Sequence, residues 1–315
     1  MSEESNLIKA SIIIVSYNSE EYIFDCIDSV KKQKYPFYEI IVVDNASIDN
    51  SVSLIKNDFP DIQIYESCKN LGFAGAVNLG VSLSKGDIIV ILNPDVIVKE
   101  KWLLSLIEAF NVKEIGIAGS LILNNNQSFI QHAGAVIKKN GITEHIELSL
   151  EEVSLEDNEG MKQKIKEKLK SKFGKNDIDY LTGASIAFRR NLYKRLKGFD
   201  EAYFPGYFEE VDFCIMAKNL GYKLILEPKS VCIHKQASSS GLFSSTFYYF
   251  YHKNRIRFIF KNYSFRKFIN VFLPSEINWI RRKRISKENI PLLKAYLINI
   301  VNIFSTLRRR KKYIS

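Results

Sequence analysis

Apolar runs and helical patterns alternate along the N-terminal part of the chain. The runs at 11–16, 39–44 and 87–92 are largely aliphatic, which is typical of strands that are buried on both faces. The segments between them, including 51–57 and 70–84, have the spacing of helices. This alternation predicts an α/β fold with a mostly parallel central sheet, in which ligands bind beyond the carboxyl ends of the strands.

The pattern loosens beyond residue 99 and ends in a long helical region. Residues 144–178 are highly charged, and we expect an exposed insertion there with one amphipathic helix, a candidate lid. We divide the chain into a domain at 1–240 and an aromatic, basic and helical extension at 241–315. The other expected elements are helices near 100–110, 190–197 and 209–220, an ordered segment at 180–189, and strands near 115–123, 134–138, 223–226 and 230–234.

Charge is distributed unevenly between these two parts. Residues 241–315 contain 17 Lys and Arg but 2 Asp and Glu, a surplus of +15, whereas the whole chain has a net charge of +10. Such an extension can bind the phosphate of anionic lipid, and we expect no nucleic acid because no recognised binding motif accompanies the charge. The aromatic and basic run at 243–260 suits a membrane headgroup zone, although a helical cap with a solvated basic end explains it almost equally well.

Composition narrows the classes of protein further. Hydrophobic residues at 46% and charged residues at 25% exclude wholesale disorder. The four Cys residues are far apart, which excludes a disulfide scaffold and a Cys-type zinc module and fits a reducing compartment. The N-terminus is polar and acidic, and no apolar run is long enough to cross a bilayer unaided. We expect a cytoplasmic protein that contacts the inner face of the cell membrane through its basic extension.

Polar residues follow several of the expected strands. Asp44 ends one strand and precedes Asn45, and an Asp here either caps the next helix or accepts a hydrogen bond from a nucleobase or ribose. Asn93 and Asp95 follow another strand, where they form either a turn or a site for Mg²⁺ or Mn²⁺ and a diphosphate. His234 ends a later strand and would complement Asp95 as a metal ligand, although a lone His is usually structural.

Two further segments combine residues that suit a ligand site. Residues 70–80 contain three Gly without Rossmann or Walker spacing, so they form either a tightly packed helix start or a surface against a nucleotide sugar. Glu209, Glu210 and Asp212 lie at a predicted helix N-terminus, where the helix dipole stabilises acids. Their crowding should raise at least one pKa, which suits a general base. Tyr207 beside them would form an apolar wall.

These segments together resemble the family 2 glycosyltransferases of the GT-A fold, most closely the rhamnosyltransferase-like branch. The resemblance runs from about residue 11 to 241 and implies a Rossmann-like GT-A domain at 1–240. It rests on five segments in the right order: SIIIVSYNSEEYIFDCIDSV, IIVVDNASIDNS, NLGFAGAVNLGV, IVILNPDV and GFDEAYFPGYFEEVDFCIMAKNLGY.

The resemblance implies roles for individual residues. Asp44 would contact the nucleobase of the donor, with Asn45 beside it. Asn93 and Asp95 occupy the position of the Asp-x-Asp metal motif, so Asp95 would bind Mg²⁺ or Mn²⁺ and the donor diphosphate, and His234 stands where some members have a further metal ligand. The other implied donor-binding residues are Asn70, Gly72 and Asn78, and the implied acceptor-side residues are Thr182, Gly183 and Tyr207, although a simple strand entry explains residues 182–184 about equally well.

For the acidic segment at 209–212, the resemblance implies that Glu210, Glu209 and Asp212 are catalytic residues. This segment occupies the position of the family's Glu-Asp-x-Asp motif, whose second acid is the usual base. That position is Glu210 here, which leaves open whether Glu209 or Glu210 takes the proton. The implied mechanism is an inverting displacement in which the base deprotonates an acceptor hydroxyl while the metal stabilises the leaving diphosphate.

The implied partners are a nucleoside-diphosphate sugar, either dTDP-rhamnose or a UDP-sugar, and a glycan or lipid-linked acceptor in cell-surface polysaccharide assembly. One alternative is a sugar nucleotidyltransferase, but the chain lacks a basic, Gly-rich phosphate loop after its first strand. Another is a non-catalytic membrane-docking or nucleic-acid-binding protein on the same fold. Sugar transfer requires Asp44, Asp95 and Glu210 to converge around a single cleft at one rim of the sheet.

Overall fold

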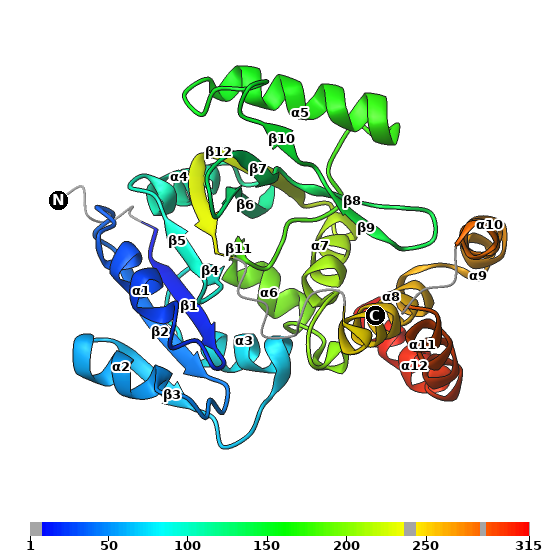
Figure 1. Ribbon diagram of the computed structural model, residues 1–315, viewed down its shortest axis with the longest axis horizontal. Coiled ribbons are helices and arrows are strands. Elements are labelled where there is room, and N and C mark those ends of the chain that lie inside the picture. The colour runs from blue at the N-terminus through cyan, green and yellow to red at the C-terminus, as the bar shows by residue number, and fades with distance from the viewer. Residues whose placement is uncertain (1–7, 236–243, 284–287, 315) are drawn as a thin grey trace.

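A ten-stranded sheet forms the centre of the molecule (Figure 1). The computed structural model describes residues 8–235, 244–283 and 288–314, with side chains as far as residue 309. The strands of this sheet are β1 (Ala10–Ser16), β2 (Tyr38–Asp44), β3 (Gln63–Glu66), β4 (Ile88–Leu92), β5 (Val96–Val98), β6 (Ile115–Asn124), β7 (Phe129–His132), β10 (Leu148–Ser149), β11 (Ser185–Arg189) and β12 (Lys223–His234). β8 (Ala135–Ile137) and β9 (Thr143–His145) form a separate hairpin.

The sheet is parallel in its N-terminal half and mixed beyond it. β1 pairs in parallel with β2 and β4, and β2 pairs in parallel with β3. β11 lies antiparallel between β4 and β6, while β12 runs parallel to β6. The predicted α/β fold is confirmed, but the mostly parallel arrangement holds only for the first four strands. The two strands expected near 223–226 and 230–234 are one strand, β12, with a bulge between Glu227 and Val231 in its pairing with β6.

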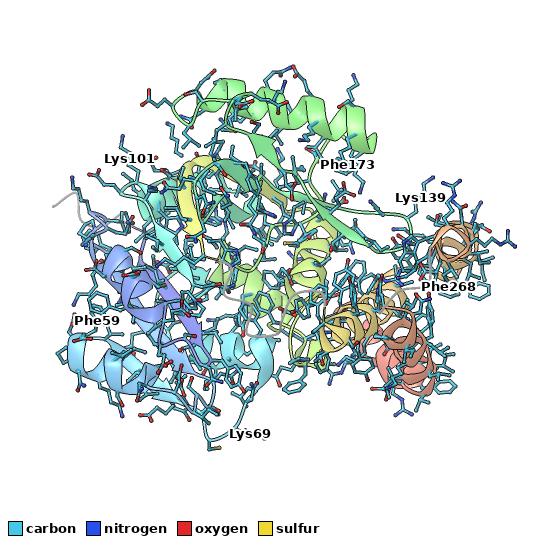
Figure 2. The ribbon with its side chains drawn as sticks, viewed as in Figure 1. Phe59, Lys69, Lys101, Lys139, Phe173 and Phe268 are labelled. Atoms are coloured by element: carbon cyan, nitrogen blue, oxygen red, sulfur yellow. The ribbon has the colours of Figure 1, made fainter. Side chains whose placement is uncertain are left out.

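Alternate residues of the central strands face two different helical layers, because side chains along a strand point to opposite faces. Ile13 of β1 belongs to one layer of the core, whereas Ile12 and Ile14 belong to the other. The first layer includes α3 (Gly72–Leu83), α6 (Arg190–Leu196) and α7 (Glu209–Asn219), and the second includes α1 (Ile23–Lys31), α2 (Ser51–Asp58) and α4 (Trp102–Ala109). Charged side chains such as Lys69 and Lys101 point outward from these layers (Figure 2).

The charged insertion contains one helix, as predicted, but it is not wholly exposed. α5 (Asn158–Phe173) buries three apolar residues at helical spacing, Met161, Ile165 and Leu169. A salt bridge from Lys172 to Glu144 connects this helix to the β8–β9 hairpin. Figure 1 shows α5 on the opposite side of the molecule from α3. This position does not favour a lid above the start of α3.

The C-terminal part of the chain is helical, as predicted, and it packs onto the sheet domain. Its elements are α8 (Ser245–Asn262), α9 (Phe265–Lys267), a π-helical turn (Phe268–Phe272), α10 (Leu273–Arg282), α11 (Asn289–Val301) and α12 (Ile303–Ile314). Ile256, Phe258 and Ile259 of α8 are buried in the same core layer as α3 and α7. The boundary expected at residue 240 lies outside the described residues.

The expected membrane contact of residues 243–260 is not supported at two basic side chains of α8, Arg255 and Arg257, because both are buried. Arg255 is fully buried and forms a salt bridge with Glu276 of α10 (2.6 Å), and Arg257 lies 3.6 Å from Asp200. Buried charges require such partners, so these residues are internal. Among the described helices, none is by itself long and apolar enough to cross a bilayer, while α11 and α12 reach that length together across a bend of 67°.

Candidate active site

The strand order brings the predicted donor-site acids to one edge of the sheet. β2 and β4 flank β1 in parallel, with Asp44 aligned to Ser16 and Leu92 aligned to Ile14. Asp44 therefore ends β2 at the edge where β4 also ends, and Asp95 follows β4 after a short turn. Parallel strands place their carboxyl ends together, so the two acids lie on either side of the end of β1.

Glu210 reaches the same edge beside Gly183. Gly183 precedes β11, whose first residue Ser185 is aligned with Leu92 at the end of β4. A Cβ atom on Gly183 would lie 3.9 Å from Cβ of Glu210 and 3.3 Å from the ring of Phe73 in α3. The candidate base and the two donor-site acids therefore share one rim of the sheet.

Two hollows on the described surface lie away from this rim, and neither is the expected cleft between the three acids. One, of about 390 Å³, is lined by Arg189, Arg190 and Lys194 near the amino ends of the parallel strands. The other, of about 550 Å³, is bordered by residues 150–156. None of the predicted site residues lines either hollow. The rim itself is the feature that brings these residues together.

Asp44 is buried and has one carboxylate oxygen available for a ligand. Its Oδ2 accepts a hydrogen bond from the backbone N–H of Ser47 (3.1 Å), whereas its Oδ1 has no hydrogen-bond partner among the described residues. A buried oxygen with unused acceptor capacity is unfavourable unless a donor reaches it. The carboxylate thus closes a local turn, and its second oxygen can accept a hydrogen bond from a bound molecule.

Asn45 and Asn70 shape the loop that precedes α3. Asn45 accepts a hydrogen bond from the N–H of Leu71 (2.7 Å) and donates one to Oδ1 of Asn70 (3.2 Å). Asn70 also accepts from the N–H of Gly72 (2.8 Å). Gly72 has a φ of +70°, and a Cβ atom there would lie 2.8 Å from the Phe204 ring, so only glycine fits. These residues position the loop at the rim, and their contact with a donor stays a prediction.

Asn78 has a scaffold role that differs from the predicted contact with the donor. Its amide donates to the carbonyl of Phe199 (3.0 Å) and to Glu201 (2.9 Å). Its oxygen accepts from the hydroxyl of Tyr193 (2.8 Å) and from the N–H of Phe199 (2.9 Å). An amide side chain has two donors and two acceptor positions, and all four are used here. Asn78 therefore joins α3 to the loop at 199–201.

Asp95 and His234 are brought together by the pairing of β5 with β12. Nε2 of His234 lies 3.2 Å from Oδ2 of Asp95, and Asp95 is buried. Two ligand atoms that each lie ~2.1 Å from an octahedral cation are about 3 Å apart, so this separation suits shared ligation of Mg²⁺ or Mn²⁺. The described residues contain no cluster of three or more metal-ligating side chains, so diphosphate oxygens and water would complete the shell. Asn93 starts the turn between β4 and β5 and is half-buried.

Glu209 and Glu210 begin α7 and form an unusual pair of acids. Glu209 is buried, Glu210 is half-buried, and Oε2 of each has no hydrogen-bond partner in the described part of the chain. Burial raises the pKa of Glu209 well above its ordinary value, and the charge of Glu210 adds to this effect. Burial also raises the pKa of Glu210 from 4.5 to about 7. At neutral pH the pair therefore retains a proton on Glu209, while Glu210 can exchange one.

The backbone before this pair is held in a strained conformation by the C-terminal extension. Tyr207 and Phe208 both have a φ of +74°, which is unfavourable for residues with a side chain. Asn254 of α8 donates hydrogen bonds to the carbonyls of Gly206 (2.7 Å) and Tyr207 (3.1 Å). This side chain positions the start of α7, a role that sequence reasoning missed.

The predicted acceptor-side residues lie close to the acid pair. The N–H of Thr182 donates to Nε2 of the buried His132 (3.4 Å), and Gly183 packs against Phe73. The ring of Tyr207 makes an edge contact with Phe247 of α8, with ring centroids 5.3 Å apart. These residues therefore border the start of α7, which leaves their contact with an acceptor as a prediction.

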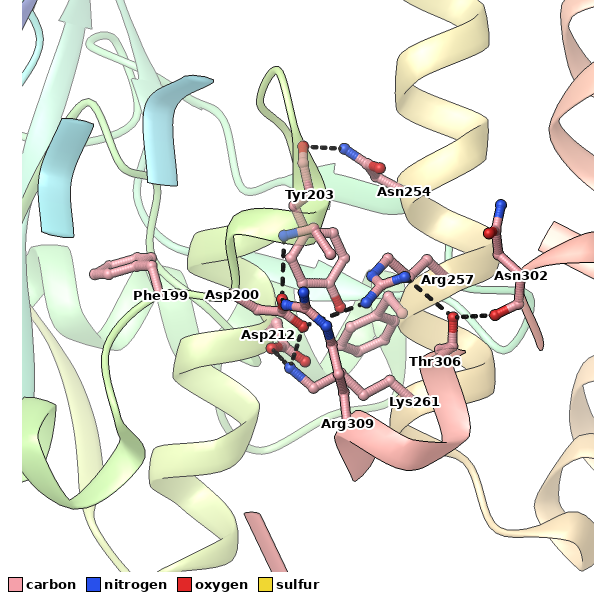
Figure 3. A network of polar contacts seen from close by, with 12 residues as sticks. Phe199, Asp200, Tyr203, Asp212, Asn254, Arg257, Lys261, Asn302, Thr306 and Arg309 are labelled. Atoms are coloured by element: carbon pink, nitrogen blue, oxygen red, sulfur yellow. Dashed lines mark hydrogen bonds and ion pairs between the residues drawn. The ribbon is translucent and has the colours of Figure 1, made fainter. Parts of the chain in front are cut away.

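Asp212 is a scaffold residue, which corrects its predicted place among the catalytic acids. It is fully buried, and its oxygens accept hydrogen bonds from Lys261 (2.6 Å) and Asn262 (2.7 Å) of α8. Lys261 also binds Asp200 (2.9 Å), which Arg309 of α12 contacts as well (Figure 3). Because its carboxylate is fully paired with these internal donors, Asp212 is unsuited to accept a proton from a substrate.

This network is the largest feature that sequence reasoning missed. Burial alone would raise the pKa of Asp200, but the charges of Lys261, Arg257 and Arg309 lower it to about 2. Asn254, Arg257 and Lys261 recur at helical spacing along α8, so their common face was visible in the sequence. Nothing in the sequence indicated that this face points inward, because the acids that it meets lie far away in the chain.

Comparison with solved structures defines the class of the fold. The mannosyltransferase PcManGT from Pyrobaculum calidifontis, in complex with GDP-Man and Mn²⁺, has a TM-score of 0.55 and 17% identity, covering 98% of this chain and 74% of that chain. S. aureus TarS 1-349 in complex with UDP-GlcNAc has a TM-score of 0.58 and 17% identity, covering 91% and 79%. The fold is therefore that of the GT-A glycosyltransferases.

Sequence comparison then defines the family. Residues 11–197 match the family described as Glycosyl transferase family 2, and this chain belongs to that family. The rhamnosyltransferase WbbL of Escherichia coli strain K12 is 26% identical over 275 residues, which cover 84% of this chain and 99% of that protein. The matches to the first three curated relatives span only 25%, 40% and 41% of their lengths.

Proposed function

We propose that this protein is an inverting, metal-dependent glycosyltransferase with Glu210 as its general base. It would move a sugar from a nucleoside diphosphate to a hydroxyl of a glycan or lipid-linked acceptor during polysaccharide assembly. The observation that supports this most strongly is the half-buried Glu210, with a pKa of about 7, beside Gly183 at the rim shared by Asp44 and Asp95.

The base step assigns different tasks to the two neighbouring acids. The carboxylate of Glu210 accepts the proton of the acceptor hydroxyl as the hydroxyl oxygen attacks the anomeric carbon. The nucleoside diphosphate leaves from the opposite face of the sugar. A base whose pKa lies near the working pH is effective because it is free to accept a proton and still basic enough to hold it. Glu209, whose pKa is raised well above its ordinary value, stays protonated at neutral pH and is less suited to the task.

The donor side of the site would be formed by Asp44, Asp95 and His234. The free Oδ1 of Asp44 can accept a hydrogen bond from a nucleobase N–H. Asp95 and His234 would hold Mg²⁺ or Mn²⁺, which stabilises negative charge on the leaving diphosphate when it is bound. We propose dTDP-rhamnose as the first donor to test, because the likeness to a rhamnosyltransferase extends over nearly all of that protein. UDP-sugars are the second choice.

The test is release of nucleoside diphosphate from a panel of nucleotide sugars with Mn²⁺ or Mg²⁺. We expect release from one donor, its loss with a chelator and its recovery when the metal is restored. Asp95→Ala should also weaken Mn²⁺ binding by the protein in titrations that do not depend on activity. The matched control is Asp87→Ala, an exposed acid near the other end of the same strand, which should leave Mn²⁺ binding unchanged.

Two results would contradict the proposal. Absence of release from every donor, with binding of lipid or nucleic acid retained, would favour a non-catalytic protein on this fold. Formation of a nucleotide sugar from a sugar phosphate and a nucleoside triphosphate would favour a nucleotidyltransferase.

A further inference from the structure

Helix α11 and the start of α12 have an exposed apolar face. The opposite side of α11 is buried through Leu292, Ala295 and Asn299. The exposed face continues across the bend into α12, and its large apolar side chains are 56–77% exposed. We call this surface the α11–α12 face, and it consists of Ile290, Leu293, Leu297, Ile300, Val301 and Phe304.

A continuous apolar surface of this kind is rare on a soluble protein unless it is covered by a partner. Lipid cannot surround the two helices, because their other side is tied to α8 by polar groups. Asn299 donates to the carbonyl of Lys253 (2.8 Å), and Arg257 donates to the hydroxyl of Thr306 (3.0 Å). These contacts favour a surface that lies on a bilayer over one that crosses it.

The charge around the face indicates its partner. Residues 289–315 contain no Asp or Glu and six Lys and Arg, of which Lys294 is exposed on α11 and five follow one another at 308–312. A second copy of the chain would bring these like charges together, which opposes association. A bilayer with anionic headgroups would accept the apolar side chains and attract the basic ones.

We infer that the α11–α12 face docks on the surface of an anionic membrane. The apolar side chains enter the boundary between headgroups and acyl chains, while the exposed basic side chains of Lys294 and Arg308 lie among the headgroups. The docking surface therefore differs from the one that the sequence suggested, because Arg255 and Arg257 of α8 are buried whereas α11 and α12 expose an apolar face.

The position of α12 connects this surface to the start of α7. Arg309 contacts Asp200, which shares Lys261 with Asp212 of α7 (Figure 3). A docked membrane would therefore have a fixed position relative to Glu210. This consequence rests on the proposed function, and it suits an acceptor that is linked to lipid.

Sedimentation of the full chain with vesicles tests the inference. We compare vesicles of phosphatidylcholine alone with vesicles that also contain phosphatidylglycerol, and we vary the salt. The wild-type chain should bind the anionic vesicles and be released by salt, because the attraction to headgroups is screened. The double variant Leu293→Asp with Leu297→Asp should lose about tenfold or more in affinity, since both apolar side chains leave the interface.

Matched controls separate this loss from misfolding and from catalysis. Leu104→Asp changes an exposed leucine of α4, and it should bind the vesicles like the wild type. Glu210→Gln should also bind them normally, so failure of catalysis and failure of docking give different results. Equal binding of the wild type and the double variant would overturn the inference. The inference would also be overturned if the wild-type chain formed a dimer that did not bind vesicles while the double variant was monomeric.

Discussion

Two pairs of buried or half-buried carboxylates in this chain, Asp200 with Asp212 and Glu209 with Glu210, behave in opposite ways. Asp200 and Asp212 share Lys261, and Asp200 also contacts Arg257 and Arg309. Glu209 and Glu210 have no basic side chain within ion-pair distance among the residues that the structure describes. The pKa of Asp200 is lowered to about 2, whereas that of Glu210 is raised to about 7.

The difference shows that the neighbours of an acid, more than its burial, decide what it does. Burial by itself raises the pKa of Asp200, Glu209 and Glu210, because it disfavours the charged form. The basic residues of α8 and α12 reverse this effect at Asp200 and make that pair part of the scaffold. The glutamates keep the raised pKa, which suits proton transfer.

The largest effect is expected on the rate of sugar transfer when the proposed base is removed. Glu210→Gln should lower the rate by ~10²–10⁴-fold, the usual contribution of a positioned base, while nucleotide binding persists. Transfer by the wild type should rise with pH and level off above about 7, where Glu210 is ionised. Steady-state rates over a range of pH and nucleotide titrations measure both effects.

A matched variant identifies which glutamate is the base. Glu209→Gln should keep most of the rate and the midpoint near pH 7, because Glu209 is already protonated there. A rate that falls with Glu209→Gln and survives Glu210→Gln would reverse the assignment.

Removal of the central cation of the scaffold pair should cost the most stability. Lys261→Met leaves two buried carboxylates without their shared partner, and breaking a buried ion pair in this way costs about 3–5 kcal/mol. The free energy of unfolding in urea measures the loss. The control is Lys56→Met, which breaks an exposed pair with Glu66 and should cost ~0–1 kcal/mol. Similar losses in the two variants would remove the contrast between the scaffold pair and the surface.

The two pairs should have opposite effects on stability as the pH changes. Glu210 has its pKa raised from 4.5 to about 7, so the stability that it contributes is present below pH 4.5 and is lost as the pH rises through about 7. Asp200 has its pKa lowered from 3.8 to about 2, so its contribution is present above pH 3.8 and is lost as the pH falls through about 2.

The variant Glu210→Gln tests this sign, because glutamine stays neutral at every pH. Well above pH 7 its Tm should exceed that of the wild type by roughly 6–12 °C, because ionising a carboxyl whose pKa is raised from 4.5 to about 7 costs about 3 kcal/mol. The difference should vanish below pH 4.5. A wild-type Tm that stays higher at alkaline pH would show that Glu210 has a partner in the folded protein.

The smallest effect is expected for the outermost cation of the scaffold pair. The side chain of Arg309 is 44% exposed, so solvent screens its contact with Asp200. Arg309→Ala should therefore cost about 1 kcal/mol or less in urea unfolding. A loss as large as that of Lys261→Met would mean that α12 is needed to hold the network together.

The sequence predicted the strands and helices of the N-terminal half well, because their apolar runs and periodicities are local. It also indicated candidate acids through their place after strands and at a helix start, and their roles in a site stay predictions. The residues at the ends of β2 and β4 lie at one rim, as expected. The sequence could not separate Asp212 from Glu209 and Glu210, because all three occupy the same helix start.

The sequence by itself determined the alternation of strands and helices, the position of each acid along the chain and the excess of positive charge at the C-terminal end. Only the tertiary structure decided which charges are paired. Lys261 and Asp212 are 49 residues apart and Arg309 and Asp200 are 109 apart, so these contacts depend on how α8 and α12 pack. The physical reason is that a pKa depends on burial and on nearby charges in space, and neither is a local property of the chain.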